Sequence, residues 1–285
     1  MGSISDISAR GNTPARYAGK PSLLVVDDVS VRFAGVKALT GVSFEVQPGE
    51  LFAIIGPNGA GKTSLLNVIS RVYQPVAGQV TFDGRDLLQL KIYQVARAGI
   101  ARTFQSLGQF PNTTVLDYLL LGRHTRMQSG ILLGGLYIGR TRSEEKKNRA
   151  YCLHLLSLLG LERWHSFPLR SLPYGLQKRA DIARALALEP RLLLLDEPVA
   201  GMSVEETEDI AAAILDIKEQ LGVTQILVEH DMALVMGIAD YVLVLDFGRV
   251  IAQGSPAEVQ ANPDVIKAYL GEELGGQASG DAVPR

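Results

Sequence analysis

Short apolar runs between turn residues dominate the first part of the chain. Residues 23–33 and 41–46 alternate apolar and polar side chains, which is the pattern of strands with one buried face. The wholly apolar LFAII at 51–55 predicts a strand that is buried on both faces, and a further short strand is expected at 78–84. From about 114 to 170, apolar residues recur at three- and four-residue spacing, so we expect helices there.

Strand-like and helix-like segments alternate after residue 190. The apolar runs RLLLLD, TQILVEHD and YVLVLDFG are separated by the amphipathic segments SVEETEDIAAAILDIKEQLG and MALVMGIA. Such alternation predicts an α/β fold in which helices cover a largely parallel sheet. We therefore expect one α/β core over residues 23–274, with a helical subdomain inserted at about 105–177, a flexible leader at 1–22 and a disordered tail at 275–285.

Composition narrows the classes of function. The chain has 285 residues, 47% of them hydrophobic, so it can bury a substantial core. Its net charge of -2 provides no basic field that would recruit nucleic acid, so an anion site has to be local. The single cysteine, Cys152, excludes an intramolecular disulfide framework and a multi-cysteine metal site. No run reaches the ~18 apolar residues of a membrane helix, so work at a membrane would depend on partners.

A glycine-rich motif follows the apolar run at 51–55. The sequence GPNGAGKT fits the phosphate-loop pattern G-x-x-x-x-G-K-[ST] and precedes a helix-like segment, a context that disfavours a turn binding nothing. Its glycines let backbone N–H groups surround phosphate oxygens, and the following helix directs its positive end at the anion. We expect Lys62 to contact the β- and γ-phosphates and Thr63 to bind Mg²⁺. The predicted phosphate site consists of Gly56, Pro57, Asn58, Gly59, Ala60, Gly61, Lys62, Thr63 and Ser64.

Two acidic residues end a later apolar strand, LLLLDE. Asp196, at the end of the strand, is expected beside the phosphate loop, where its carboxylate would hold Mg²⁺ directly or through water. Glu197 is expected to point elsewhere and to polarise a water molecule that attacks the γ-phosphate. Alone, such a strand end is often an ordinary terminus, and the phosphate-loop motif favours the catalytic interpretation.

Five motifs occur in a fixed order along the chain: GPNGAGKT, ARTFQ, LPYGLQKRADIARAL, LLLLDEP and VEHD. In order and approximate spacing they resemble the motifs of ATP-binding-cassette (ABC) transporter ATPases, and the resemblance covers about residues 23 to 274. It implies a P-loop NTPase of α/β class with a RecA-like, mostly parallel sheet, an antiparallel β subdomain and an inserted α-helical subdomain. It also implies ATP hydrolysis, with ATP and Mg²⁺ bound, coupled to transmembrane transport.

The resemblance gives roles to three further residues. Gln105 matches the glutamine that senses Mg²⁺ and the attacking water while contacting the transmembrane partner. His230 matches the histidine that contacts the γ-phosphate, and Phe33 matches the position of an aromatic ring that stacks on adenine. Without the resemblance, Gln105 could start a helix, His230 could be a surface histidine and Phe33 could belong to the core.

Within the family, the chain most resembles the ATPases of branched-chain amino acid importers. The segments GIARTFQSLGQFPNTTVLDYLLLGRH, DEPVAGMSVEETED and the long C-terminal stretch from VEHD to GEEL carry this resemblance, together with the insert at 130–142. It implies two transmembrane permease subunits, a second ABC ATPase and, indirectly, a periplasmic or extracellular solute-binding protein. The protein would then lie at the cytoplasmic face of the inner or plasma membrane.

Three alternatives stay open. Lipopolysaccharide-export ATPases share much of this motif context. Soluble cassette proteins of translation or DNA repair use the same ATPase, although two cassettes or a long coiled-coil insertion are absent from this sequence. A nucleotide-binding scaffold without turnover is the third alternative.

The segment LPYGL departs from the usual family signature, Leu-Ser-Gly-Gly-Gln. Only Leu172 and Gly175 match, and Pro173 replaces a serine whose hydroxyl would reach the γ-phosphate bound by the partner subunit. A proline suits the first turn of a helix, and Gly175 still offers a backbone N–H to that phosphate. We therefore expect a weakened contact between subunits, which favours a heterodimer whose other ATPase carries the fuller signature, although a homodimer stays possible.

Overall fold

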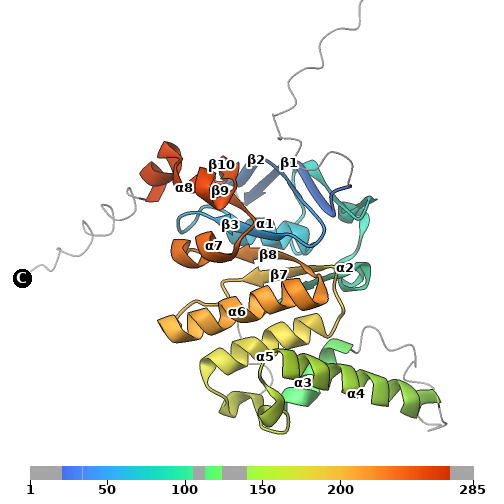
Figure 1. Cartoon of the computed structure of the whole chain (residues 1–285). Helices are drawn as coiled ribbons and strands as arrows, with labels where there is room; N and C mark the ends of the chain where they lie inside the picture. Colours follow the sequence, from blue (N-terminus) through green and yellow to red (C-terminus); the bar gives the residue numbers. More distant parts are fainter. Residues whose placement is uncertain (1–20, 34, 105–112, 124–139, 270–285) are drawn as a thin grey trace, which may run out of the picture.

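Two β-sheets organise the computed structural model of the protein, which describes residues 21–33, 35–104, 113–123 and 140–269 (Figure 1). The smaller sheet is antiparallel, in the order β2-β1-β4-β5. Its strands are β1 (Leu24–Phe33), β2 (Val36–Val46), β4 (Ala77–Phe82) and β5 (Arg85–Asp86). The alternating burial along β1 confirms the half-buried strand that the sequence predicts.

The larger sheet is mostly parallel, in the order β10-β9-β3-β8-β7-β6, and only β10 at one edge runs antiparallel to its neighbour. Its strands are β3 (Leu51–Ile55), β6 (Ile100–Arg102), β7 (Leu192–Asp196), β8 (Thr224–Val228), β9 (Tyr241–Asp246) and β10 (Arg249–Gly254). Every residue of β3, β7 and β8 is buried, as expected for parallel strands covered on both faces. The predicted α/β fold with a mostly parallel sheet and a separate antiparallel sheet is therefore confirmed.

The side chains of β3 divide the core into two apolar clusters. Leu51, Ala53 and Ile55 face one cluster, which includes buried residues of the helices that cover that face. Phe52 and Ile54 face the other, which joins the parallel sheet to the antiparallel sheet and to the first helix. The alternation along a single strand thus packs one element against both layers.

Helices cover the parallel sheet and form a group at the far end from the antiparallel sheet (Figure 1). The helices are α1 (Lys62–Ile69), α2 (Ile92–Ala98), α3 (Val115–Arg123), α4 (Arg140–Leu158), α5 (Tyr174–Leu186), α6 (Val204–Leu221), α7 (Met232–Ile238) and α8 (Pro256–Gln260). Short 3₁₀ turns lie at Leu87–Gln89, Glu162–Trp164 and Leu169–Ser171. None of the helices in the described ranges is long and apolar enough to cross a bilayer.

The two predicted boundaries of the helical subdomain, at about 105 and 177, do not coincide with the ends of described helices. Residue 105 lies outside the described residues, and residue 177 lies within α5. The leader at 1–20, the insert at 130–139 and the tail at 275–285 are also outside the described ranges.

Local signals explain where α6 begins and ends. Ser203 and Glu206 form a capping box at its start, in which each side chain bonds to the backbone N–H of the other residue. Gly222 ends it in the left-handed conformation with φ 63°. α6 is the next element after β7, so the capping box at Ser203 sets where the segment that follows the predicted catalytic strand end stops.

Candidate nucleotide-binding site

The predicted phosphate loop joins β3 to α1, as the motif requires. Gly56 and Gly61 have φ of 147° and 102°, in the region that side chains rarely adopt. A β-carbon at Gly56 would collide with the carbonyl oxygen of Leu245, and one at Gly61 would lie 2.7 Å from the carbonyl oxygen of Ala38. Gly61 is also the N-cap of α1 and provides no side-chain cap, and the N-terminus of such a helix attracts anions.

The turn between β9 and β10 supports the phosphate loop through backbone hydrogen bonds. The N–H of Gly248 donates to the carbonyl oxygen of Ala60 at 2.9 Å, and the carbonyl oxygen of Gly248 accepts from the N–H of Thr40 at 2.8 Å. Gly248 therefore joins the phosphate loop to β2 through its own backbone. The shape of the loop depends on segments almost two hundred residues away in the sequence.

Lys62 lies across the loop that it follows. Its Nζ atom donates to the carbonyl oxygens of Gly56 at 2.5 Å and Pro57 at 3.0 Å, and the residue is buried. Thr63 and Ser64 follow in the first turn of α1 and are half-buried, while Asn58 and Gly59 are exposed at the tip of the loop. An ammonium group thus stands at the loop that is predicted to bind the phosphates.

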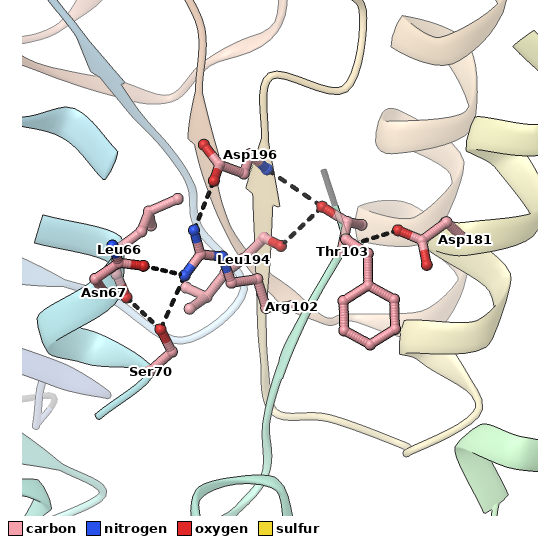
Figure 2. Close-up of polar contacts among 9 residues, drawn as sticks. Leu66, Asn67, Ser70, Arg102, Thr103, Asp181, Leu194 and Asp196 are labelled. Atoms are coloured by element: carbon pink, nitrogen blue, oxygen red, sulfur yellow. Dashed lines mark hydrogen bonds and ion pairs between the residues drawn. The ribbon is translucent and has the colours of Figure 1, made fainter. Parts of the chain in front are cut away.

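Asp196 ends β7 with a side chain that is fully buried, and Arg102 of β6 contacts it. The Nη2 atom of Arg102 donates to Oδ2 of Asp196 at 2.6 Å (Figure 2). The Nη1 atom donates to Oδ1 of Asn67 at 2.7 Å and to Oγ of Ser70 at 3.1 Å. One guanidinium therefore joins Asp196 to α1, the helix that carries Lys62 and Thr63.

Glu197 turns the chain sharply after Asp196. Its φ is 47°, a left-handed conformation that costs a non-glycine residue about 1 kcal/mol or more. Its N–H donates to the carbonyl oxygen of Val228 at 2.9 Å, which holds the turn against the end of β8. Strained conformations of this kind cluster at functional sites. Here the strained residue turns the chain away from the direction of β7, which ends at Asp196.

His230 follows β8 and is exposed, as the surface alternative predicts, and it lies next to a buried acid. The Nδ1 atom of His230 is 3.7 Å from Oε2 of Glu229, whose side chain is fully buried. Burial raises the pKa of the Glu229 carboxyl above its usual value, against the opposing effect of backbone N–H groups from Val199 and His230. The exposed ring leaves His230 able to reach a bound ligand.

Phe33 lies at the surface and not in the core. Its side chain is 42% exposed, and its ring meets the ring of Tyr73 edge to face with the centroids 4.7 Å apart. The alternative that Phe33 is a core residue is therefore wrong. Stacking on adenine stays a prediction, which an exposed ring face at the end of β1 permits.

Gln105 lies outside the described residues, but the residue before it is held firmly. The N–H of Phe104 donates to Oδ2 of Asp181 on α5 at 2.5 Å. Oδ1 of the same buried carboxylate accepts from the hydroxyl of Tyr118 and from Nε of Arg184, both at 2.8 Å. The chain thus enters residue 105 from a point fixed to the helical group.

The unusual signature segment lies at the start of α5. Its proline precedes the first turn of the helix, which begins at Tyr174. Pro173 is the N-cap, and its carbonyl oxygen accepts the hydrogen bond from the N–H of Gln177 at 3.0 Å. Gly175 is buried, and a β-carbon there would lie 3.1 Å from Oε1 of Glu206 on α6. A larger residue at this position would require the Glu206 side chain to shift by a few tenths of an ångström.

The oxygen donors of the site suit a hard cation. In the part of the chain that the structure describes, no three His, Cys, Asp or Glu side chains gather into a metal site. The carboxylate of Asp196 and the hydroxyl of Thr63 are oxygen ligands of the kind that Mg²⁺ takes, together with phosphate oxygens and water. The donor set fits a Mg²⁺ that arrives with a nucleotide better than a metal held by the protein alone.

Two protein families match the sequence. The family described as ABC transporter matches residues 39–200, which is more than half of the chain. The chain belongs to the ABC transporter family. A second family, described as branched-chain amino acid ATP-binding cassette transporter, matches residues 249–274 of this ABC ATPase.

Solved structures and curated relatives agree with the family. The chain is 30% identical to an ATP-binding cassette of an ABC transporter crystallised in its ADP conformation, with a TM-score of 0.78, covering 88% of this chain and 100% of that one. A nucleotide-free cassette gives 30% identity and a TM-score of 0.76, covering 87% of this chain and 99% of that one. The predicted ABC ATPase fold is therefore confirmed, and with it an enzyme that hydrolyses ATP.

Two bacterial relatives carry a more specific name. The high-affinity branched-chain amino acid transport ATP-binding protein BraF of Pseudomonas aeruginosa is 38% identical over 250 residues, covering 88% of this chain and 98% of the relative. The protein of the same description, LivG, from Escherichia coli (strain K12) is 37% identical over 250 residues with the same coverage. The predicted resemblance to this group of ABC ATPases is confirmed.

Three residues of this ABC ATPase contact the predicted site although the motifs did not single them out. Arg102 and Asn67 form the link between Asp196 and α1, and Glu229 holds the turn after Glu197. Arg102 stands in the quoted motif ARTFQ and Glu229 in VEHD, so a charged residue at the end of an apolar run was the available signal. Asn67 carries no such signal, because a polar residue on a helix is ordinary.

Proposed function

We propose that this ABC ATPase powers the import of branched-chain amino acids or related small polar or amphipathic solutes across a membrane. The match of residues 249–274 to the branched-chain amino acid cassette family carries this proposal, because the phosphate-loop motif is common to many NTPases. Relatives described as branched-chain amino acid transport ATP-binding proteins align over 88% of the chain and support it. The ATPase itself would act at the cytoplasmic face of the membrane without contacting the solute.

The residues of the phosphate loop would bind ATP. Backbone N–H groups of the loop and of the first turn of α1 would surround the phosphates, and Lys62 would exchange its contacts with the Gly56 and Pro57 carbonyl oxygens for phosphate oxygens. Phe33 would stack on the adenine. Thr63, Asp196 and Gln105 would hold Mg²⁺ with the nucleotide, and that ion would neutralise charge on the phosphates.

Glu197 and His230 would act on the water and the γ-phosphate. The left-handed turn at Glu197 separates its carboxylate from that of Asp196, so one acid can orient a cation while the other accepts a proton from water. His230 would donate to the γ-phosphate from its exposed position after β8. Gln105 would help to orient the attacking water.

A second ABC ATPase would complete each nucleotide site. The N-terminus of α5, with Gly175, would face the phosphate loop of the partner and contribute its N–H groups and helix dipole. Because Pro173 supplies neither hydroxyl nor N–H, we favour a heterodimer with a partner that carries the fuller signature. Two permease subunits would contact the dimer near Gln105, and a solute-binding protein would act on the far side of the membrane.

A pair of acid-to-amide substitutions tests the catalytic assignment. Glu197→Gln is expected to slow ATP hydrolysis by ~10²–10⁴-fold, the usual worth of a general base, and to leave ATP binding intact. Glu208→Gln, on the exposed face of α6, is the matched control and should leave turnover unchanged. Lys62→Ala should weaken both ATP binding and hydrolysis. Near-normal turnover of Glu197→Gln would show that another group is the base.

Reconstitution tests the transport assignment. The chain should copurify with two permeases and a second ATPase, and ATP-dependent uptake of labelled leucine into proteoliposomes should require the solute-binding protein. Uptake of another small solute would correct only the substrate. ATP-dependent lipopolysaccharide extraction, turnover without any permease partner, or binding without turnover would instead favour the export, soluble-cassette or scaffold alternatives.

A further inference from the structure

The Arg102 side chain joins two elements of the nucleotide-binding core, β7 and α1. The guanidinium donates to Asp196 at the end of β7, to Asn67 on α1 and to Ser70, the C-cap residue of that helix (Figure 2). Ser70 is itself fixed, because its hydroxyl donates to the carbonyl oxygen of Leu66 at 2.6 Å. Both Nη atoms of Arg102 therefore meet partners whose positions are set by a helix or a strand.

The backbone that carries Arg102 is fixed as well. The N–H of Thr103 donates to the carbonyl oxygen of Leu194 at 3.0 Å, and the N–H of Asp196 donates to the hydroxyl of Thr103 at 3.3 Å. The carbonyl oxygen of Arg102 accepts from Nη2 of Arg184 on α5 at 2.9 Å. The guanidinium thus extends from a rigid point on β6, which is the requirement for a side chain that orients another.

The charge of Asp196 makes this contact necessary. A carboxylate with no exposed surface is costly unless a cation and hydrogen bonds compensate it, and Arg102 supplies both in the described structure. A bond to Oδ2 also fixes the plane of the carboxylate and therefore the direction of its other oxygen. A fork-shaped guanidinium can do this while bonded to α1, whereas the single nitrogen of a lysine cannot span both.

We propose that Arg102 is a positioning residue that orients the Asp196 carboxylate for Mg²⁺ and locks it to the helix that carries Lys62 and Thr63. The proposal rests on the assignment of Asp196 as a Mg²⁺ ligand. Arg102 touches neither nucleotide nor metal in this role. It sets the distance between the strand end that holds the cation and the loop that holds the phosphates, so the two halves of the site move as one unit.

Nucleotide binding measured against Mg²⁺ concentration tests the proposal. Affinity for a fluorescent ATP analogue is determined in EDTA and over a Mg²⁺ titration, for the wild type and for Arg102→Lys, Arg102→Gln and Asp196→Asn. Arg102→Lys keeps the charge and loses the fork, so the Mg²⁺ concentration at half-effect should rise about 10-fold or more, the usual cost of removing a group that orients a metal ligand. Affinity in EDTA should not change. Arg97→Ala, on the exposed surface of α2, is the matched control and should behave as the wild type.

The outcomes separate the two assignments. An unchanged Mg²⁺ dependence in both Arg102 variants, with a large change in Asp196→Asn, would overturn the role of Arg102 alone. An unchanged dependence in Asp196→Asn would overturn the assignment of Asp196 as the ligand. An equal loss of affinity with and without Mg²⁺ would show that Arg102 only maintains the fold, and thermal unfolding of each variant in EDTA would then show the same loss.

Discussion

Oε1 of Glu229 accepts a hydrogen bond from the backbone N–H of Val199 at 3.0 Å, although thirty residues separate them in the sequence. The other carboxylate oxygen accepts from the N–H of His230 at 3.2 Å. One buried side chain therefore ties the turn after Glu197 to the start of the segment that carries His230. The segments of two predicted catalytic residues, Glu197 and His230, are thus linked through a third residue.

Glu229 should give the protein a characteristic dependence of stability on pH. Burial raises the pKa of its carboxyl in the folded state above the unfolded value of about 4.5. The folded state then binds more protons than the unfolded state, so this group's contribution to the free energy of unfolding is fully present below pH 4.5 and is lost as pH rises through the raised pKa. Measured by urea unfolding, wild-type stability relative to Glu229→Gln should fall over that window. A difference that stays constant or grows with pH would contradict the prediction.

Replacing Phe247 by asparagine should stabilise the protein. Phe247 and Gly248 form a two-residue turn with φ of 43° and 76°, the signs of a type I′ turn, and the Phe247 side chain is 85% exposed. Asparagine tolerates this conformation better than phenylalanine, and little packing is lost. Phe247→Asn should gain about 0.5–1 kcal/mol, seen as a rise of about 1–4 °C in the melting temperature. Phe247→Ala keeps the strain and should show no such gain, and an equal rise in both variants would argue against backbone strain as the cause.

Cys152 should resist thiol reagents in the folded protein. It lies in α4 with no exposed surface, and burial raises the pKa of its thiol from 9.0 to about 11. That shift alone lowers the thiolate fraction about 100-fold at pH 8, and burial hinders the reagent further. Ellman's reagent should therefore titrate one thiol rapidly in urea and react at least 100-fold more slowly without it. A cysteine at exposed position 154, made by His154→Cys in a Cys152→Ala background, is the control and should react rapidly in both conditions. Rapid labelling of native Cys152 would show that α4 opens readily.

Pro173→Ser should strengthen pairing between ATPase subunits. Pro173 caps α5 without a side-chain hydrogen bond, and a serine there could cap the helix or reach a phosphate across the interface. All variants carry Glu197→Gln. Light scattering should show more ATP-dependent dimer when Pro173→Ser is added than when Pro173 is unchanged. Pro173→Ala, which lacks the hydroxyl, should match the protein in which Pro173 is unchanged. An equal dimer fraction in all three would mean that backbone N–H groups and the helix dipole already suffice.

The sequence predicts local features of the site well and contacts between distant segments poorly. The phosphate loop could be predicted because its glycines, Lys62 and Thr63 occupy consecutive positions between a strand and a helix. The bond between Arg102 and Asp196 could not, because 94 residues separate them and only the order of strands β6 and β7 makes them neighbours. A three-residue strand such as β6 also shows too little periodicity to be distinguished from a loop.

The apolar pattern also does not determine whether a single residue at the end of a strand is buried or exposed. Phe33 ends an alternating strand, and the alternation does not state whether the last position packs inward or lies at the surface. The irregular register between β1 and β2 decides it, since several shifts separate Phe33 from the regular part of the pairing. Such shifts arise from tertiary packing and have no reliable signature in one sequence.

The contact of Gly248 with Ala60 places a late segment of the chain under an early motif. The eight residues of the phosphate loop are complete soon after synthesis begins, but the turn that supports them is made only when β9 and β10 exist. A nascent chain that stops before residue 248 therefore has the whole motif but lacks the turn whose backbone hydrogen-bonds to it. We therefore expect the affinity for ATP to develop only when the parallel sheet is complete. A truncated or miscleaved product should not bind ATP even though its motif is intact.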